Sequence, residues 1–200
     1  MSPASELLSP LQDKRCRAGA LDNGLRRRFA PAGRELDLLD IREGQSVADL
    51  GTGVGFLLPE LLRRVGPMGH VLALDPDQRN LSLARARVSG DTRVKFVLGS
   101  ASEPHGFPPG SQDRVLLSLV LCCLVDKKGT MAQAWDLLRP GGLVLASYPR
   151  IRAPWRRASR SLRVSPERWD ALRSQFPWEE LPAPRGRFVT RHLLRKPSKS

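Results

Sequence analysis

The chain has 200 residues, with 33 Lys or Arg against 20 Asp or Glu, and a formal net charge of +13. A chain of this length buries roughly 70% of its unfolded surface, so one core needs no disulfide framework, and three Cys could not close one. The longest apolar run, residues 115–125, is shorter than the roughly 20 residues of a membrane span, and the first residues lack the features of a secretory signal. We therefore expect no transmembrane segment and a cytoplasmic location.

Apolar strands and amphipathic helices alternate through the middle of the chain. The pattern predicts strands at 46–50, 70–75, 93–98, 114–121 and 143–148. It predicts helices at 31–40, 56–65, 77–88 and 128–138. Further along, Ser165 can cap a helix opened by Pro166, with Trp169, Leu172 and Phe176 along one face, and 188–194 reads as a final strand.

Such alternation with near-continuous apolar strands indicates a parallel sheet, because right-handed crossovers place each connecting helix over the sheet. The predicted fold class is α/β, a Rossmann-like, doubly wound, mostly parallel sheet of about seven strands with helices on both faces. We expect a single domain over residues 1–200. It would consist of an N-terminal extension at 1–33, a cofactor-binding core at 34–149 and a basic segment at 150–200 that completes the sheet.

The stretch VADLGTGVGF at 47–56 carries the most chemical information. An apolar strand ends in Asp49 and leads through Gly51, Gly53 and Gly55 into a helix, which is typical of a nucleotide-binding turn. Glycines let the backbone turn tightly and approach a ligand, and the helix start offers unpaired N–H groups. A tight turn without any ligand is the alternative reading of this stretch.

Asp75 ends the second strand, where a carboxylate can accept both hydroxyls of a ribose. Capping of the following helix is the alternative, and it suits Asp77 better than Asp75. A dinucleotide site requires G-x-G-x-x-G, but Phe56 stands at the last position, which makes NAD the weaker candidate.

Together these motifs resemble the class I S-adenosylmethionine-dependent methyltransferases, in particular the small-molecule group that includes ubiquinone/menaquinone biosynthesis enzymes. The resemblance covers about residues 34–149, including the turn LLRPGG at 137–142. It implies S-adenosylmethionine as cofactor and a site made of the glycine loop, the second strand end, the loop after the third strand and the end of the fourth. The implied cofactor-binding residues are Asp49, Gly51, Thr52, Gly53, Gly55, Asp75, Pro76, Gly99, Ser100, Ala101 and Ser118. Ser100 replaces an Asp that is common in the family, so it can hydrogen-bond but brings no charge.

No catalytic residue can be named from the sequence, which has no evident acid/base pair, catalytic triad or metal-ligand cluster. Methyl transfer from a sulfonium needs mainly a positioned acceptor and exclusion of water, so this is compatible with the resemblance. His70, His105 and His192 stand apart, and only His105 lies near the expected site. The substrate-side candidates are Leu121, Cys122 and Tyr148. We interpret Cys122 and Cys123 as pocket wall or core rather than as a redox or arsenic site, because Cys is a small hydrophobe and adjacent Cys rarely bridge.

Basic residues concentrate at the far end, where 150–200 holds 14 basic and 4 acidic residues. Six Arg and one Trp lie between Arg150 and Arg163, a density suited to phosphate binding by RNA, a phosphorylated metabolite or an anionic surface. A solvated basic linker is equally compatible. The leading hypothesis is therefore a methyltransferase with an unidentified small-molecule acceptor. The alternatives are an RNA methyltransferase that uses this segment and a non-catalytic protein that binds a cofactor or partner.

Overall fold

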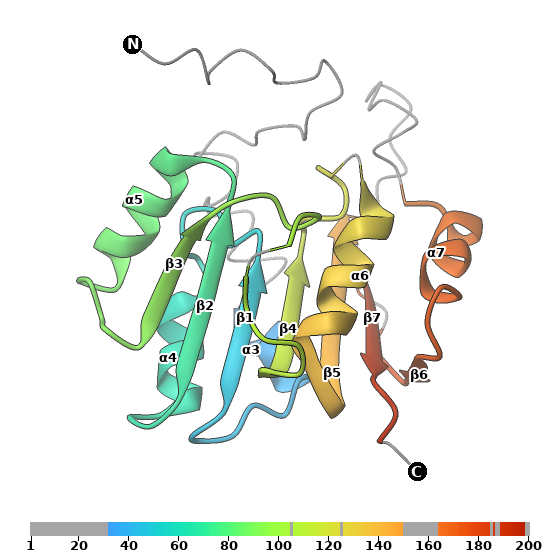
Figure 1. Cartoon of the computed structure of the whole chain (residues 1–200), viewed down its shortest axis with the longest axis horizontal. Coiled ribbons are helices and arrows are strands. Elements are labelled where there is room, and N and C mark those ends of the chain that lie inside the picture. The colour runs from blue at the N-terminus through green and yellow to red at the C-terminus, as the bar shows by residue number, and fades with distance from the viewer. Residues whose placement is uncertain are drawn as a thin grey trace.

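A computed structural model describes residues 32–104, 106–124, 126–149, 164–184, 186 and 189–198. A seven-stranded sheet with the order β3-β2-β1-β4-β5-β7-β6 runs through the centre (Figure 1). The strands are β1 Ser46–Leu50, β2 His70–Asp75, β3 Val94–Leu98, β4 Gln112–Ser118, β5 Leu138–Pro149, β6 Glu179–Leu181 and β7 Val189–Arg195. The helices are α3 Ala32–Asp37, α4 Leu58–Val65, α5 Gln78–Arg87, α6 Lys127–Leu137 and α7 Pro166–Arg173. The predicted fold class is confirmed.

The first five strands are parallel, whereas β7 pairs antiparallel with both β5 and β6. Each face of the sheet carries its own apolar core. Side chains of α4 and of the segment that begins with α3 pack in one core, and those of α6 and α7 pack in the other. Every helix within the described ranges is too short or too polar to cross a membrane.

The direction of strand order reverses beside β1, which has β2 on one side and β4 on the other. In open α/β sheets, ligands bind outside the carboxyl ends of the strands at this type of switch point. The glycine loop follows β1, so the fold places the most informative sequence motif at the position where a ligand is expected.

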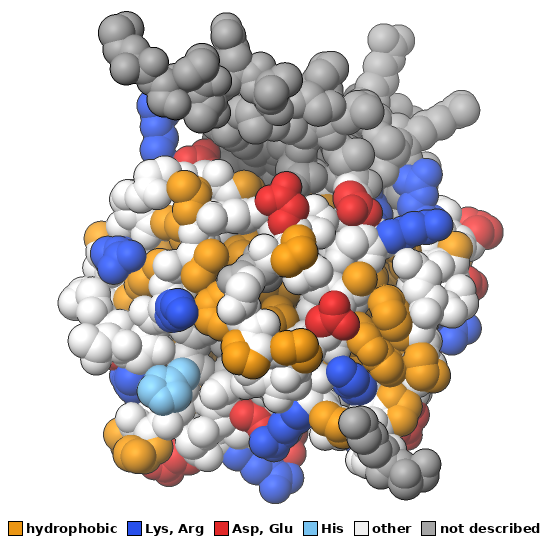
Figure 2. Space-filling view, viewed as in Figure 1, with side chains coloured by type: hydrophobic (Ala, Val, Ile, Leu, Met, Phe, Trp, Pro, Cys, Tyr) orange, Lys and Arg blue, Asp and Glu red, His pale blue; other side chains and the backbone are white. Residues whose placement is uncertain are grey.

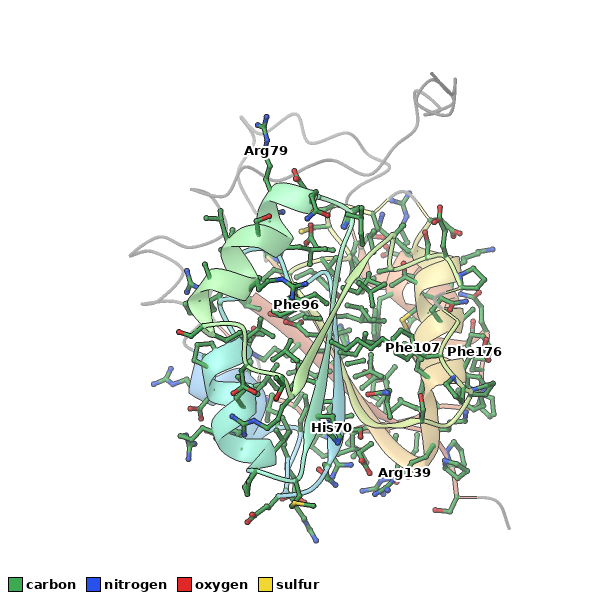
Figure 3. The ribbon with its side chains drawn as sticks, turned by 60° about the vertical axis from the view of Figure 1, so that its left-hand side comes forward. His70, Arg79, Phe96, Phe107, Arg139 and Phe176 are labelled. Carbon is green, nitrogen blue, oxygen red and sulfur yellow. The ribbon has the colours of Figure 1, made fainter. Side chains whose placement is uncertain are left out.

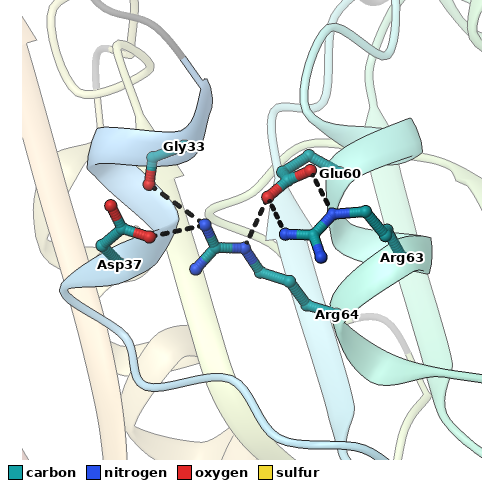
Figure 4. Close-up of polar contacts among 5 residues, drawn as sticks. All are labelled: Gly33, Asp37, Glu60, Arg63 and Arg64. Carbon is teal, nitrogen blue, oxygen red and sulfur yellow. Dashed lines mark hydrogen bonds and ion pairs between the residues drawn. The ribbon is translucent and has the colours of Figure 1, made fainter.

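Arg64 of α4 forms hydrogen bonds and an ion pair with α3 (Figure 4). Its guanidinium donates to Asp37 at 2.6 Å and to Glu60 at 2.8 Å, and it also reaches the carbonyl of Gly33 at 3.3 Å. Glu60 also accepts a hydrogen bond from Arg63. Hydrogen bonding to these two arginines lowers the pKa of Glu60 to about 2. The short helix α3 is therefore joined to α4 by charged contacts as well as by apolar burial.

Two predicted strand boundaries differ from the structure by three residues or more. The strand predicted to continue to Leu121 ends at Ser118, because Leu119 has a φ of +56° and turns the chain. The fifth strand begins at Leu138 rather than Leu143, since Leu138 pairs with Gln112 of β4, and Gly141 and Gly142 exchange backbone hydrogen bonds with Lys196. In both cases the main chain departs from what the apolar pattern indicates.

The helical predictions also ran beyond the structure. The helix predicted at 31–40 spans only α3, the one predicted at 56–65 begins at Leu58, and α7 ends at Arg173. Phe176 therefore lies after α7, where its ring stacks on Trp135 of α6 at 5.0 Å between centroids. Figure 3 labels Phe176 beside α6, and Figure 2 shows the hydrophobic side chains that gather on this side of the molecule.

Candidate functional site

The glycine loop between β1 and α4 has a backbone that only glycine adopts easily. Gly51, Gly53 and Gly55 have φ values of +85°, +56° and +73°. A Cβ at Gly51 would lie 2.4 Å from Val120 Cγ2, and one at Gly55 would lie 2.9 Å from the Ala84 backbone. These glycines therefore let the loop pack against both the segment after β4 and helix α5.

Asp49 and Thr52 hold the loop from within. Asp49, the fourth residue of β1, is buried, and its Oδ2 accepts a hydrogen bond of 2.8 Å from Thr52 Oγ1. Thr52 N and Gly51 N both donate to the carbonyl of Leu74 on β2 at 2.8 Å. The loop is thus fixed to the neighbouring strand before any ligand is considered.

Asp75 connects β2, the glycine loop and α5. Its Oδ2 accepts from Gly53 N at 2.8 Å, while Oδ1 accepts from Asp77 N at 2.9 Å and Asn80 Nδ2 at 3.1 Å. Burial raises the pKa of Asp75, and these three hydrogen bonds oppose that shift. Asp77 caps α5 by accepting from Arg79 N at 2.8 Å, so the capping role expected for Asp77 rather than Asp75 is confirmed.

Pro76 and the loop after β3 lie at the same end of the sheet. Pro76 directly follows Asp75, and Gly99 N donates to the carbonyl of Asp75 at 3.2 Å. Ser100 Oγ lies 2.9 Å from Ser102 Oγ, and Ala101 is buried in the core. The structure therefore brings together the predicted residues that follow β1, β2 and β3.

Ser118 belongs to a buried polar cluster that the sequence did not indicate. Its Oγ donates to Glu35 Oε2 of α3 at 2.5 Å. The other carboxylate oxygen, Glu35 Oε1, lies 3.8 Å from Arg191 Nε on β7, and neither atom has a hydrogen-bond partner. Exposed fractions are only 1% for the Glu35 side chain and 8% for that of Arg191. Acidic and basic residues so far apart in the chain carry no pairing signal, so only the fold could reveal this contact.

The loop after β4 presents the other substrate-side candidates. Leu119 N donates to the carbonyl of Ser147 at 2.9 Å, which anchors the loop to β5. Leu121 is completely buried, whereas Cys122 and Cys123 are partly exposed. Leu121 is consequently core, and Cys122 is a partly buried side chain that packs against this core.

Tyr148, near the end of β5, joins a hydrogen-bonded chain of three side chains. Its hydroxyl lies 2.9 Å from His192 Nε2, and His192 Nδ1 lies 2.9 Å from Glu180 Oε1. Trp169 of α7 stacks on the His192 ring at 3.9 Å between centroids. Burial raises the pKa of Tyr148 to about 12 and lowers the pKa of His192. From the sequence His192 was interpreted as isolated, because its distance along the chain from Tyr148 and Glu180 gives no indication of these contacts.

Two earlier candidates lie outside the described residues, namely His105 and the arginine-rich segment 150–163. In the part of the chain that is described, no three His, Cys, Asp or Glu residues form a group that could hold a metal ion.

Comparison with known proteins agrees with this arrangement. A sequence family described as "Methyltransferase domain" matches residues 48–146. Nocamycin O-methyltransferase of Saccharothrix syringae is 35% identical over 60% of this chain and 44% of its own length. A ubiquinone/menaquinone biosynthesis C-methyltransferase of Vibrio campbellii is 32% identical over 55% of this chain and 43% of its own length. The chain thus spans less than half the length of the curated relatives it matches.

A longer alignment joins the chain to an uncharacterized 37.1 kDa protein in a transposon of Streptomyces fradiae, with 32% identity over 80% of this chain and 40% of that protein. Among solved structures, an S-adenosylmethionine-dependent methyltransferase from Aquifex aeolicus superposes with a TM-score of 0.76 at 18% identity. The superposition covers 89% of this chain and 96% of the Aquifex chain, so the whole fold is shared.

Proposed function

Because this chain belongs to the class I S-adenosylmethionine-dependent methyltransferases, we propose that it transfers a methyl group from S-adenosylmethionine to a small-molecule acceptor. The observation that carries the proposal is the glycine loop joined to Asp75 through the Gly53 N–H at 2.8 Å. This contact puts a buried carboxylate and a backbone with left-handed glycines beside the switch point of the sheet.

The residues present suit the cofactor. Asp75 offers a carboxylate for the two ribose hydroxyls, and Gly51, Gly53 and Gly55 give the loop beside it a left-handed backbone. Ser100 and Ala101 would border the adenine, and Asp49, Thr52 and Ser118 would line the methionine end. When bound, S-adenosylmethionine supplies a methyl group already activated on a sulfonium. The protein has then to hold the acceptor in line and to exclude water.

We assign the acceptor side to the loop after β4 and to the end of β5. Leu121 is completely buried and supports this loop from the core, whereas Cys122 is partly exposed and Tyr148 brings a hydroxyl from the end of β5. Burial raises the pKa of Tyr148 to about 12, so its hydroxyl stays protonated at neutral pH and can donate a hydrogen bond. The proposal names no catalytic residue, because positioning alone suffices for this reaction class.

The small-molecule class rests on the relatives named as O- and C-methyltransferases, and the acceptor itself is unidentified. No observation favours the RNA alternative, whose basic segment 150–163 lies outside the described residues, or the non-catalytic one. The proposal includes the organisation suggested above, with residues 34–149 as the cofactor-binding core. It also includes a cytoplasmic location, the setting expected for a chain whose three Cys cannot close a disulfide framework.

The test is calorimetric titration of the full chain with S-adenosylmethionine and with its demethylated product, beside NAD as a control. We expect binding of the first two and none of NAD. Asp75→Ala should abolish that binding, whereas Asp136→Ala, on the exposed surface of α6, should preserve it. Equal binding by both variants, or binding of NAD alone, would contradict the proposal. If the cofactor binds, acceptor screens with small molecules and RNA then identify the substrate.

A further inference from the structure

Tyr148, His192 and Glu180 form a hydrogen-bonded chain that methyl transfer by positioning alone does not require. They come from β5, β7 and β6, which are neighbours in the sheet. Burial lowers the pKa of His192, so its ring is neutral at neutral pH. A carboxylate only accepts hydrogen bonds, so Nδ1, which lies 2.9 Å from Glu180 Oε1, carries the ring proton. Nε2 is then bare and accepts the Tyr148 hydroxyl at 2.9 Å.

Packing holds the His192 ring in the orientation that both hydrogen bonds need. Trp169 of α7 is 3% exposed and stacks on the ring, with 3.9 Å between centroids and 22° between planes. Arg173 Nε lies 3.6 Å from the other carboxylate oxygen of Glu180. The charged groups that face the ring are thus Glu180 of β6 and Asp170 and Arg173 of α7. A hydroxyl bonded to an imidazole that a carboxylate orients is the arrangement with which enzymes activate hydroxyl groups.

The chain of hydrogen bonds leads from the acceptor side of the site to the surface. Tyr148 belongs to the same apolar cluster as Leu121 and Leu124 of the loop after β4. The exposed fraction is 7% for Tyr148, 18% for the His192 side chain and 37% for that of Glu180. A proton that passes from Tyr148 to His192 therefore moves toward water.

The direction of these hydrogen bonds sets a requirement for the methyl acceptor. Because the Tyr148 proton points at His192, the lone pairs of the phenol oxygen are left to accept from another donor. An acceptor with an O–H or N–H group supplies such a donor, and it also releases a proton when it is methylated. A base within hydrogen-bond reach of that proton lowers the barrier. The arrangement therefore favours a hydroxyl or an amine over a carbon acceptor.

We propose that Tyr148, His192 and Glu180 form a proton relay for a hydroxyl or amine acceptor. This inference rests on the proposed methyl transfer and adds the acceptor class to it. The bond from the methyl carbon to the acceptor oxygen or nitrogen forms, and the bond from that carbon to sulfur breaks with its electron pair on sulfur. The acceptor proton moves to the Tyr148 oxygen while the Tyr148 proton moves to His192 Nε2. The imidazolium beside Glu180 then releases a proton to water, so no oxidant or reductant is needed.

The first measurement needs no acceptor. NMR of the full chain, labelled with ¹⁵N in histidine, shows which ring nitrogen of His192 carries the proton, with the signals assigned from His192→Gln. We expect the proton on Nδ1 and a bare Nε2 at neutral pH. A proton on Nε2 would overturn the relay, because that nitrogen could not take the Tyr148 proton.

The second measurement compares two acceptors of different acidity, phenol and 4-nitrophenol, at a pH at which only 4-nitrophenol is ionised. Transfer of a tritiated methyl group is followed for each. His192→Gln should lower kcat for phenol about a hundredfold or more with little change in KM. The same variant should lower kcat for 4-nitrophenol less than about fivefold, since this acceptor has already lost its proton. Glu180→Gln and Tyr148→Phe should show the same contrast. The matched control is His70→Gln, at the exposed start of β2, which should leave both rates unchanged.

Equal losses for the two phenols would indicate a structural role and overturn the relay. So would a native chain that binds S-adenosylmethionine in calorimetry but methylates none of phenol, 4-nitrophenol and benzylamine. Failure to bind S-adenosylmethionine would instead contradict the proposed function itself, on which the histidine NMR measurement does not depend. Circular dichroism of each variant checks that it is folded.

Discussion

Removing one partner from the buried contact between Glu35 of α3 and Arg191 of β7 should cost more stability than removing one partner of an exposed ion pair within the described residues. Removing Arg191 leaves the Glu35 carboxylate buried, and among the described residues the Ser118 hydroxyl is then its remaining partner. At the observed 3.8 Å, two unit charges attract by about 4 kcal/mol at an effective dielectric constant of about 20. Loss of one partner from a buried pair typically costs about 3–5 kcal/mol, because the other charge stays desolvated.

We therefore expect Arg191→Met to lower the free energy of unfolding by about 3–4 kcal/mol, the lower part of that range, since Ser118 still donates to Glu35. The matched control is Arg63→Met. Arg63 is also hydrogen-bonded to a glutamate, Glu60, but lies on the surface, so its replacement should leave the stability nearly unchanged. The double variant Glu35→Met with Arg191→Met should recover much of the loss, because apolar side chains then fill the site.

Urea unfolding followed by circular dichroism measures all four free energies, provided that the dependence on urea is the same for each variant. The reasoning is refuted if Arg191→Met is no less stable than Arg63→Met. It is also refuted if the double variant is no more stable than Arg191→Met alone.

Three further predictions concern the glycine loop, the Asp75 carboxyl and the His192 imidazole. Gly51→Ala should abolish binding of S-adenosylmethionine by calorimetry, because its φ is +85° and its Cβ meets Val120. Gly90→Ala, with a φ of +68° but open space, should not. Cofactor affinity should fall as pH decreases through the raised pKa of Asp75, since a protonated carboxyl accepts poorly from ribose, and Asp75→Asn should show a flat profile. Because burial lowers the pKa of His192, the unfolded chain binds more protons below about pH 6.5. Stability should therefore fall there with decreasing pH, and less so in His192→Gln, as urea unfolding at two pH values can measure.

The parallel part of the sheet was predictable because its strands are short, apolar and separated by turn residues. The glycine loop and Asp75 were predictable for a related reason: their chemistry depends on residues close together in sequence. Strand β6 was missed because Glu179–Leu181 has three residues, two of them charged, and pairs only with β7. An apolar pattern gives no signal for such a segment.

Contacts between distant segments were beyond sequence reasoning. The pairing of Glu35 with Arg191 and the chain from Tyr148 through His192 to Glu180 depend on the antiparallel register of β7 against β5 and β6. Similarly, the apolar run after Val115 predicts a strand as far as Leu121, but the left-handed backbone of Leu119 ends it. A run of apolar residues indicates that a segment is buried, and both a strand and a buried turn produce such a run.

The position of β7 has a consequence for synthesis on the ribosome. Strand β6 is made before β7 but touches the sheet only through it, while β5 pairs with β4 and also with β7. As the chain emerges from its N-terminal side, the five parallel strands can associate first, and one side of β5 then remains unpaired until β7 appears. The nascent protein therefore passes through a stage with an open sheet edge, at which a chaperone or a second nascent chain can bind.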